Sequence, residues 1–260
     1  NYYWDFGNGN TLSGVKFPPA QIYYQGTWTI MLVSGNACGT DTVYHTIVVD
    51  TIPTAIMTAT PIIGCTPLTV VTTNSSVGGA LSYQWFIDGI LTYTTATIPN
   101  QVFTAPAGNA VALHTIHLRV INHCGQDDTT VTITVHPQVV AIVAPLSSTI
   151  CAGSSVMFTQ SSQGTMLTYA WTFGNGNTST SATPPAQTYV TPGVYTILLT
   201  VTGFCGTDTA SAHVVVNPIP VAPTAPGTSI CAGSTATLTA TAPGGTYTWW
   251  SAPVAGTLLQ

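Results

Sequence analysis

Hydrophobic and polar residues alternate with a period of two along several segments of the chain. Between residues 195 and 202, tyrosine, isoleucine, leucine and valine alternate with threonine, and residues 131–135 repeat the pattern. Such alternation is typical of a β-strand with one buried face. Turns such as Gly174-Asn175-Gly176 and Pro192-Gly193 bound these segments. The pattern predicts an all-β fold.

A Tyr-x-Trp triplet recurs about every 80 residues, the length of one small sandwich domain. The triplets end at Trp4, Trp85, Trp171 and Trp249, and six cysteines keep the same period in two phases. We expect each of these tryptophans to pack between two sheets as the core aromatic. With prolines marking the junctions, the chain divides into repeat 1 (1–52, the C-terminal part of a domain), repeat 2 (53–137), repeat 3 (138–218) and repeat 4 (219–260, the N-terminal part of a domain).

Charged residues make up only 3% of the chain, which has two Lys or Arg, seven Asp and no Glu. A net charge of -5 without a basic cluster gives no electrostatic basis for binding nucleic acid. No apolar stretch reaches the roughly 18 to 20 residues that a membrane span needs. The composition favours strands and tight turns and argues against both kinds of partner.

The sequence offers no recognisable catalytic or metal-binding motif. It has no Glu, no G-x-S-x-G, no H-E-x-x-H and no phosphate-binding glycine loop. His114 and His117 lie three residues apart on a predicted strand, where alternation sends them to opposite faces. We therefore assign no catalytic residue, no metal ligand and no cofactor.

The pattern Y-x-W-x-F-G-x-G at residues 169–176, followed by G-x-Y-x-I-x-L-x-V at 193–201, resembles the polycystic-kidney-disease (PKD) domain, an Ig-like sandwich. The resemblance covers repeats 1 to 3. Repeat 4, with I-C-A-G-S-T-A-T-L-T-A at 230–240, resembles the Ig-like modules that accompany PKD repeats in very large secreted proteins of Bacteroidota, exported by the type IX secretion system. The resemblance implies tandem Ig-like β-sandwich domains arranged as an elongated rod. Asn8 and Asn175 stand where the family's turn carries Asp, so we assign no cation there.

The cysteines lack C-x-x-C spacing, which favours structural disulfides over metal or redox chemistry. Intradomain pairs, Cys65–Cys124 and Cys151–Cys205, are one possibility. In a sandwich, however, a cysteine before strand B and one after strand F lie at opposite poles, about 26 Å apart over eight residues, and a disulfide cannot span that distance. We therefore favour an interdomain pair, Cys65 with Cys205, and the remaining cysteines would pair outside this segment: Cys38, Cys124, Cys151 and Cys231.

Four Asp-Thr pairs resemble the O-glycosylation signal of Bacteroidota. Without the family, an Asp-Thr pair beside a Cys-Gly turn is also ordinary turn chemistry at the start of a strand, and both interpretations stay open. The candidate acceptors are Thr42, Thr51, Thr129 and Thr209. Trp28 and Trp250 fall outside the triplets and are candidates for exposed contacts.

Taken together, these features predict a non-enzymatic, extracellular repeat protein of a bacterial cell surface that forms a stiff stalk or filament. Its expected partners are copies of itself, neighbouring repeats and surface glycans. The alternative is a spacer or carbohydrate-binding region of a secreted hydrolase, because PKD modules also occur in such enzymes.

Overall fold

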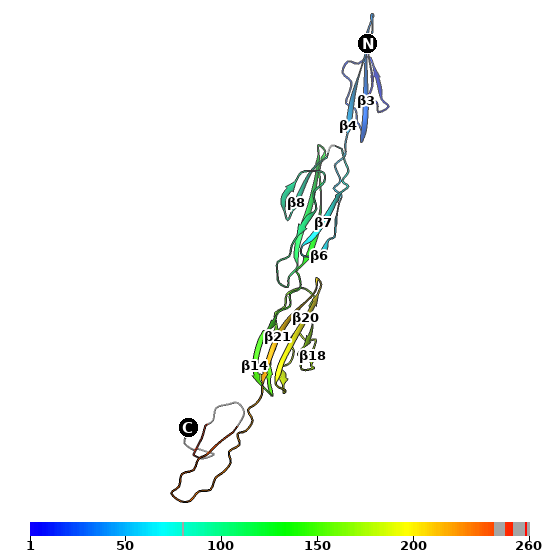
Figure 1. Ribbon diagram of the computed structural model, residues 1–260. Coiled ribbons are helices and arrows are strands. Elements are labelled where there is room, and N and C mark those ends of the chain that lie inside the picture. The colour runs from blue at the N-terminus through cyan, green and yellow to red at the C-terminus, as the bar shows by residue number, and fades with distance from the viewer. Residues whose placement is uncertain (80, 242–247, 252–257, 259–260) are drawn as a thin grey trace. The chain divides into compact units, whose positions relative to one another are not determined.

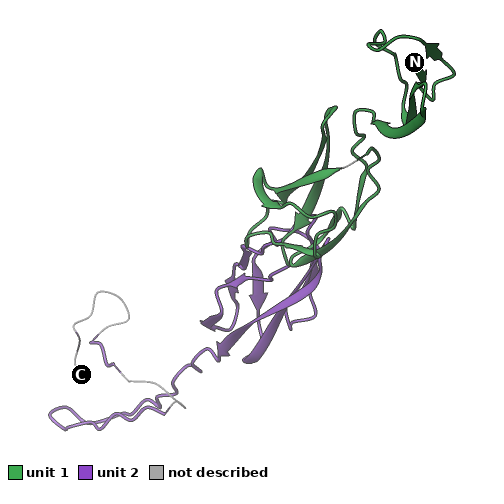
Figure 2. Cartoon of the chain, turned by 90° about the horizontal axis from the view of Figure 1, so that it is seen from above, with its two compact units in different colours: residues 1–138 green, residues 139–260 purple. Residues whose placement is uncertain are grey.

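The computed structural model describes residues 1–79, 81–241, 248–251 and 258, and it contains strands but no helix among these residues (Figure 1). The all-β expectation is confirmed. The chain divides into two compact units, residues 1–138 and 139–260 (Figure 2). Within the described residues, no helix has the length and apolar character needed to cross a membrane.

Repeat 3, in the second unit, is a complete sandwich. Its five-stranded sheet has the order β14-β21-β20-β17-β18, and two short pairs, β13-β16 and β15-β19, supply the opposite layer. The strands are β13 (Val143–Ala144), β14 (Ser147–Cys151), β15 (Ser154–Val156), β16 (Thr159–Gln160), β17 (Thr168–Thr172), β18 (Thr178–Ser179), β19 (Gln187–Tyr189), β20 (Gly193–Gly203) and β21 (Gly206–Asn217).

The core of repeat 3 follows the alternation of the sequence. Ile197 and Leu199 on β20 are fully buried, and their neighbours Thr196 and Leu198 are exposed. Trp171 is 1% exposed and lies stacked beside Phe173, with ring centroids 5.8 Å apart. Its indole N–H donates to the carbonyl of Ser181, so the one polar atom of this large side chain is satisfied within the core.

Repeat 2, in the first unit, is also a two-layer sandwich, but its smaller layer is one three-stranded sheet instead of two separate pairs of strands. Its five-stranded sheet has the order β6-β12-β11-β8-β9, and the facing sheet has the order β10-β7-β5. The strands are β5 (Met57–Thr60), β6 (Ile63–Cys65), β7 (Leu68–Asn74), β8 (Ser82–Ile87), β9 (Ile90–Tyr93), β10 (Gln101–Phe103), β11 (Ala112–Asn122) and β12 (Gly125–His136).

Trp85 occupies the centre of repeat 2, as Trp171 does in repeat 3. It has no exposed surface, and its indole N–H donates to the carbonyl of Thr95 at 2.9 Å. Buried side chains from both sheets surround it, including Val70 on β7 and Ile116 on β11. The structure therefore places the tryptophans of repeats 2 and 3 between two layers.

Repeat 1 consists of one sheet of order β2-β1-β3-β4. Trp4 lies parallel to Phe6 and donates to the carbonyl of Val15, but it is only half-buried. Ile30 and Leu32 are also half-buried, whereas their counterparts in repeat 3, Ile197 and Leu199, are fully buried. The strands are β1 (Tyr2–Asp5), β2 (Thr11–Ser13), β3 (Gly26–Asn36) and β4 (Gly39–Val49).

The described part of repeat 4 forms isolated β-bridges, Thr224 with Thr241 and Trp250 with Leu258, and no named strand. Trp249 is half-buried and Trp250 is 57% exposed, while Tyr247 of the fourth triplet lies outside the described residues. A buried core role for Trp249 is therefore not seen in the described residues.

Replacing Trp171 with Ala should destabilise repeat 3 by roughly 3–5 kcal/mol, because a buried aromatic and its contacts would be lost from a closed core. Hydrogen–deuterium exchange of the β20 amides reports the local free energy of opening. Trp250→Ala serves as the control and should change stability by less than about 0.5 kcal/mol. A similar, small loss for both variants would contradict the core role of Trp171.

Candidate functional site

A network of hydrogen bonds surrounds the hairpin turns that join the last two strands of repeats 1, 2 and 3. These turns, here called the FG turns, have two residues each: Ala37-Cys38, His123-Cys124 and Phe204-Cys205. The side-chain carbonyl of the asparagine before the turn accepts the cysteine N–H, at 2.8 Å for Asn36 and 2.9 Å for Asn122. In repeats 1 and 2 this bond fixes the backbone of the turn that carries the cysteine, whereas repeat 3 has Gly203 at the position of the asparagine.

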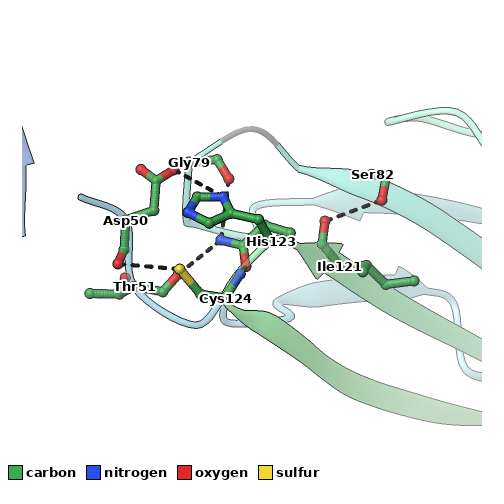
Figure 3. A network of polar contacts seen from close by, with 8 residues as sticks. Asp50, Thr51, Gly79, Ser82, Ile121, His123 and Cys124 are labelled. Atoms are coloured by element: carbon green, nitrogen blue, oxygen red, sulfur yellow. Dashed lines mark hydrogen bonds and ion pairs between the residues drawn. The ribbon is translucent and has the colours of Figure 1, made fainter. Parts of the chain in front are cut away.

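Figure 3 shows the FG turn of repeat 2 closing on the chain that enters this repeat. The side-chain amide of Asn122 donates to the carbonyl of Thr51 at 2.8 Å. The thiol of Cys124 contacts the carbonyl of Asp50 at 3.4 Å, and His123 Nδ1 lies 3.7 Å from Asp50 Oδ2. The two turn residues and the asparagine before them thus contact two consecutive residues of the linker.

Glycines permit this close approach of the linker. Asn122 also donates to the carbonyl of Gly79 at 3.2 Å, and a side chain at position 79 would collide with the carboxylate of Asp50. A side chain at Gly78 would press on Pro53. The linker of residues 50–55 is therefore packed against the body of repeat 2.

In repeats 2 and 3, the aspartate that follows the Cys-Gly pair anchors the segment with which the chain enters the repeat. Asp127 Oδ2 accepts the backbone N–H of Ala55 at 2.9 Å, and Asp208 Oδ2 accepts that of Ala141 at 2.8 Å. Donation by the Ala141 N–H, and then by the Thr209 N–H, lowers the pKa of Asp208 below its ordinary value. These carboxylates therefore act as structural hydrogen-bond acceptors, a role that sequence reasoning missed.

The cysteines fall into two classes. Cys65 and Cys205 are disulfide-bonded, whereas Cys38, Cys124, Cys151 and Cys231 carry free, exposed thiols. The intradomain pairs that the sequence left open, Cys65–Cys124 and Cys151–Cys205, are therefore not formed.

Strand register explains why a pair within one repeat fails. Cys65 is opposite His136, the last residue of β12, whereas Cys124 directly precedes the first residue of that strand. Cys151 and Cys205 have the same relation to β21. A strand of 12 residues separates its ends by about 36 Å, far more than the roughly 4.4–6.8 Å between the Cα atoms of a disulfide.

The candidate glycosylation sites differ in accessibility. Thr42, Thr51 and Thr209 are exposed. Thr129 is half-buried and lies opposite Leu118 on β11, so it belongs to the inner face of the sheet. Alternation along β12 explains this position, since the neighbouring Thr130 is exposed. Thr129 is thus the least accessible of the four hydroxyl groups.

The histidines serve the fold. His114 contacts the carboxylate of Asp88 at 2.8 Å and the carbonyl of Thr104 at 3.0 Å, so both ring nitrogens face acceptors. Burial lowers the pKa of His114, but these hydrogen bonds outweigh it and the pKa is raised overall. His117 lies on the other face of β11, as predicted, where it contacts Asp128 and stacks on Phe86.

Two further polar side chains have structural roles that were not predicted. Trp28 is half-buried and donates to the carbonyl of Tyr24, matching Tyr195, which donates to Thr191. An exposed contact at Trp28 stays a prediction, since part of this side chain is exposed. The amide of Asn175 donates to the carbonyl of Thr188 while its side-chain oxygen accepts the N–H of Asn177. An aspartate could not make the first of these bonds, which accounts for asparagine in this turn.

Comparison with known proteins agrees with this geometry. Residues 136–218 match the family model of the PKD domain, and residues 220–260 match that of an Ig-like domain described as CHU_C associated. No curated protein sequence matches the chain. The matched segments and the fold support a tandem repeat region that contains a PKD-like and an Ig-like domain.

Solved structures of immunoglobulin tandems resemble the chain in fold. The I-band fragment I67-I69 from titin has a TM-score of 0.52 at 12% identity, covering 84% of this chain and 88% of that one. Sidekick-1 immunoglobulin domains 1–5 have a TM-score of 0.36 at 15% identity, covering 84% and 52%. Tandem Ig-like β-sandwich domains are therefore confirmed as the fold, and domains of this type are generally non-catalytic.

Asp208→Asn should destabilise repeat 3 by roughly 1 kcal/mol at pH 7, because an exposed charge-assisted hydrogen bond to Ala141 is weakened. The carboxyl pKa is lowered by folding, so its contribution is present above the unfolded value and is lost as pH falls through the folded value. The difference between wild type and variant should therefore shrink in acid. Thermal unfolding at several pH values measures this effect.

Asp41→Asn is the matched control, since Asp41 bonds only to the adjacent N–H of Thr42 among the described residues. It should leave stability nearly unchanged. A penalty for Asp208→Asn that persists undiminished in acid would contradict the assigned role of the carboxylate.

Proposed function

We propose that this chain is a structural and adhesive segment of a large extracellular protein, displayed on or released from a bacterial surface, in which tandem repeats form a stiff stalk or filament. The proposal includes export by the type IX system of Bacteroidota, which the family resemblance implies. PKD and Ig-like domains together with a disulfide are consistent with an extracellular protein. The chain has no catalytic role in this proposal.

The docked linker of repeat 2 carries the proposal. Small tandem domains usually move as hinges about free linkers. Here residues 50–55 are bound at three points by the FG turn and by Asp127. Because backbone carbonyls and an N–H group of this linker are already bound to repeat 2, the linker cannot rotate freely. We therefore expect it to transmit force along the chain without reorienting.

The outer face of the large sheet supports lateral association. In repeat 3, Thr168, Thr202 and Thr207 lie side by side across three strands, and Thr200 and Thr209 form part of the next row. The hydroxyl groups of Thr202 and Thr207 bond to each other at 2.9 Å. Native sheets usually carry charges that oppose self-association, and this face lacks them. Copies of the chain and surface glycans are therefore the partners that we propose.

We propose that Cys65 and Cys205, both disulfide-bonded, pair with each other, and that this bond stiffens the chain beside a linker. Non-reducing digestion of the purified chain followed by mass spectrometry should yield one peptide pair containing these two cysteines. Peptides of Cys38 should appear unpaired in the isolated 260-residue chain and serve as the control. A peptide that links Cys65 to Cys124 would overturn the assignment.

Protease treatment of intact cells tests the location. Peptides from residues 1–260 should be released without lysis, and peptides of a cytoplasmic marker protein should not. Release only after lysis would contradict a surface or secreted role. Specific binding or cleavage of a polysaccharide by the purified native protein would instead favour the region of a secreted hydrolase.

A further inference from the structure

An open cavity of about 540 Å³ lies at the FG turn of repeat 1. Its lining includes Asn36, Cys38 and Asp41, together with backbone of the first and third strands. Polar groups line most of it, and no described residue of the chain fills it. The equivalent position in repeat 2 is occupied by a segment of the chain, and this comparison indicates which kind of ligand the cavity of repeat 1 would bind.

The corresponding space in repeat 2 is filled by the linker. The sequence Asn-x-Cys-Gly-x-Asp stands at residues 36–41 and again at 122–127, 86 positions later. In repeat 2 the asparagine donates to the Thr51 carbonyl, the cysteine contacts the Asp50 carbonyl and the aspartate accepts the Ala55 N–H. Three side chains thus recognise the backbone of one extended segment.

Repeat 1 carries the same three side chains at the equivalent positions, and two of them have polar groups that no linker occupies among the described residues. Asn36 holds the N–H of Cys38 at 2.8 Å, as Asn122 holds that of Cys124 at 2.9 Å. The Asn36 amide nitrogen has no hydrogen bond among the described residues. The Asp41 carboxylate accepts only the N–H of Thr42 there, whereas its counterparts in repeats 2 and 3 accept the backbone N–H of Ala55 and of Ala141.

We infer that the cavity of repeat 1 is a docking site for an inter-repeat linker, an extended peptide of the type found at residues 50–55. This inference rests on the proposed role of the chain as part of a longer repeat protein. In this site Asn36 donates to the linker carbonyl equivalent to that of Thr51, and Asp41 accepts the N–H equivalent to that of Ala55. Cys38 contacts the carbonyl equivalent to that of Asp50. The ligand is recognised through its backbone, so linkers of different sequence fit as long as they are extended.

Register gives this site a second property. Cys65 and Cys151 lie opposite the last residues of β12 and β21, His136 and Asn217. Asp50 is the residue of repeat 1 that corresponds to these two, 86 positions before His136. Because Cys124 contacts Asp50, Cys124 lies at the position of repeat 1 that corresponds to the strand ends opposite Cys65 and Cys151 in repeats 2 and 3. A docked linker therefore brings a cysteine within reach of Cys38.

Disulfide tethering tests the site on the 260-residue chain. The probe is a synthetic peptide of residues 47–57 carrying the Asp50→Cys substitution, with its thiol activated as the mixed disulfide of thionitrobenzoate. The thiolate of Cys38 attacks the peptide sulfur, a new S–S bond forms, and thionitrobenzoate leaves with the electron pair. The chain used has Cys124→Ser, Cys151→Ser and Cys231→Ser, so that Cys38 is its one free thiol.

At thiol–disulfide exchange equilibrium, under conditions that leave Cys65 and Cys205 disulfide-bonded, peptide capture at Cys38 should exceed capture at Cys151 by about tenfold, the worth of one or two hydrogen bonds. The Cys151 control is a matched chain with Cys38→Ser in place of Cys151→Ser. Asp41→Ala should remove most of the preference, and a scrambled peptide should show none. Amides of residues 36–41 should gain protection from hydrogen exchange when the peptide is bound.

Equal capture at the two cysteines would overturn the docking site, as would a preference that survives both Asp41→Ala and scrambling of the peptide. Either result is distinguishable from failure of the proposed function, because surface location and the Cys65–Cys205 pair are measured independently of the peptide.

Discussion

The length of the last strand in each repeat is the constraint on which the other features depend. A strand of 12 residues holds its two ends about 36 Å apart, and one class of cysteine lies at each end. A cysteine can therefore find a partner only beyond its own repeat. The same strand places the FG turn of repeat 2 beside the incoming linker, so the two are joined by hydrogen bonds where the chain enters this repeat. The proposed Cys65–Cys205 bond would add a covalent link beside the next linker. The sandwich core fixes this geometry, because Trp85 and Trp171 lock the sheets that carry the long strands.

The junction uses hydrogen bonds where many proteins use ion pairs. With charged residues at 3% of the sequence, salt bridges can contribute little to holding the repeats. The FG turn instead binds linker carbonyls through an asparagine amide and a thiol, and an aspartate accepts a linker N–H. Such contacts depend on the extended conformation of the linker and hardly on its side chains. The junction can then recur along a chain whose repeats have diverged in sequence.

Period-two alternation and the recurring triplet were enough to predict the strands and the buried positions of Trp85 and Trp171. The roles of Asp127, Asp208 and Asn175 could not be predicted, because each depends on a backbone group brought close only by folding. The hydrogen bond of Trp28 was missed for a related reason: the counterpart of Trp28 is Tyr195, and the shared bond to a carbonyl four residues earlier relates two different side chains. Cysteine pairing could be predicted in part. Strand length argued against the intradomain scheme, which is not formed, and the favoured pair of Cys65 with Cys205 stays a prediction.

Repeat 1 shows what a lone sheet of this composition lacks. Ile30 and Leu32 are half-buried, whereas the equivalent Ile197 and Leu199 are completely covered. Burial of apolar surface is worth about 25 cal/mol per Å², so a second layer over this sheet would be strongly favourable. The open FG cavity lies in the same repeat and is polar. In repeat 2 one continuous stretch, the linker followed by β5 to β7, supplies both an apolar layer over the large sheet and the backbone groups that the FG turn binds.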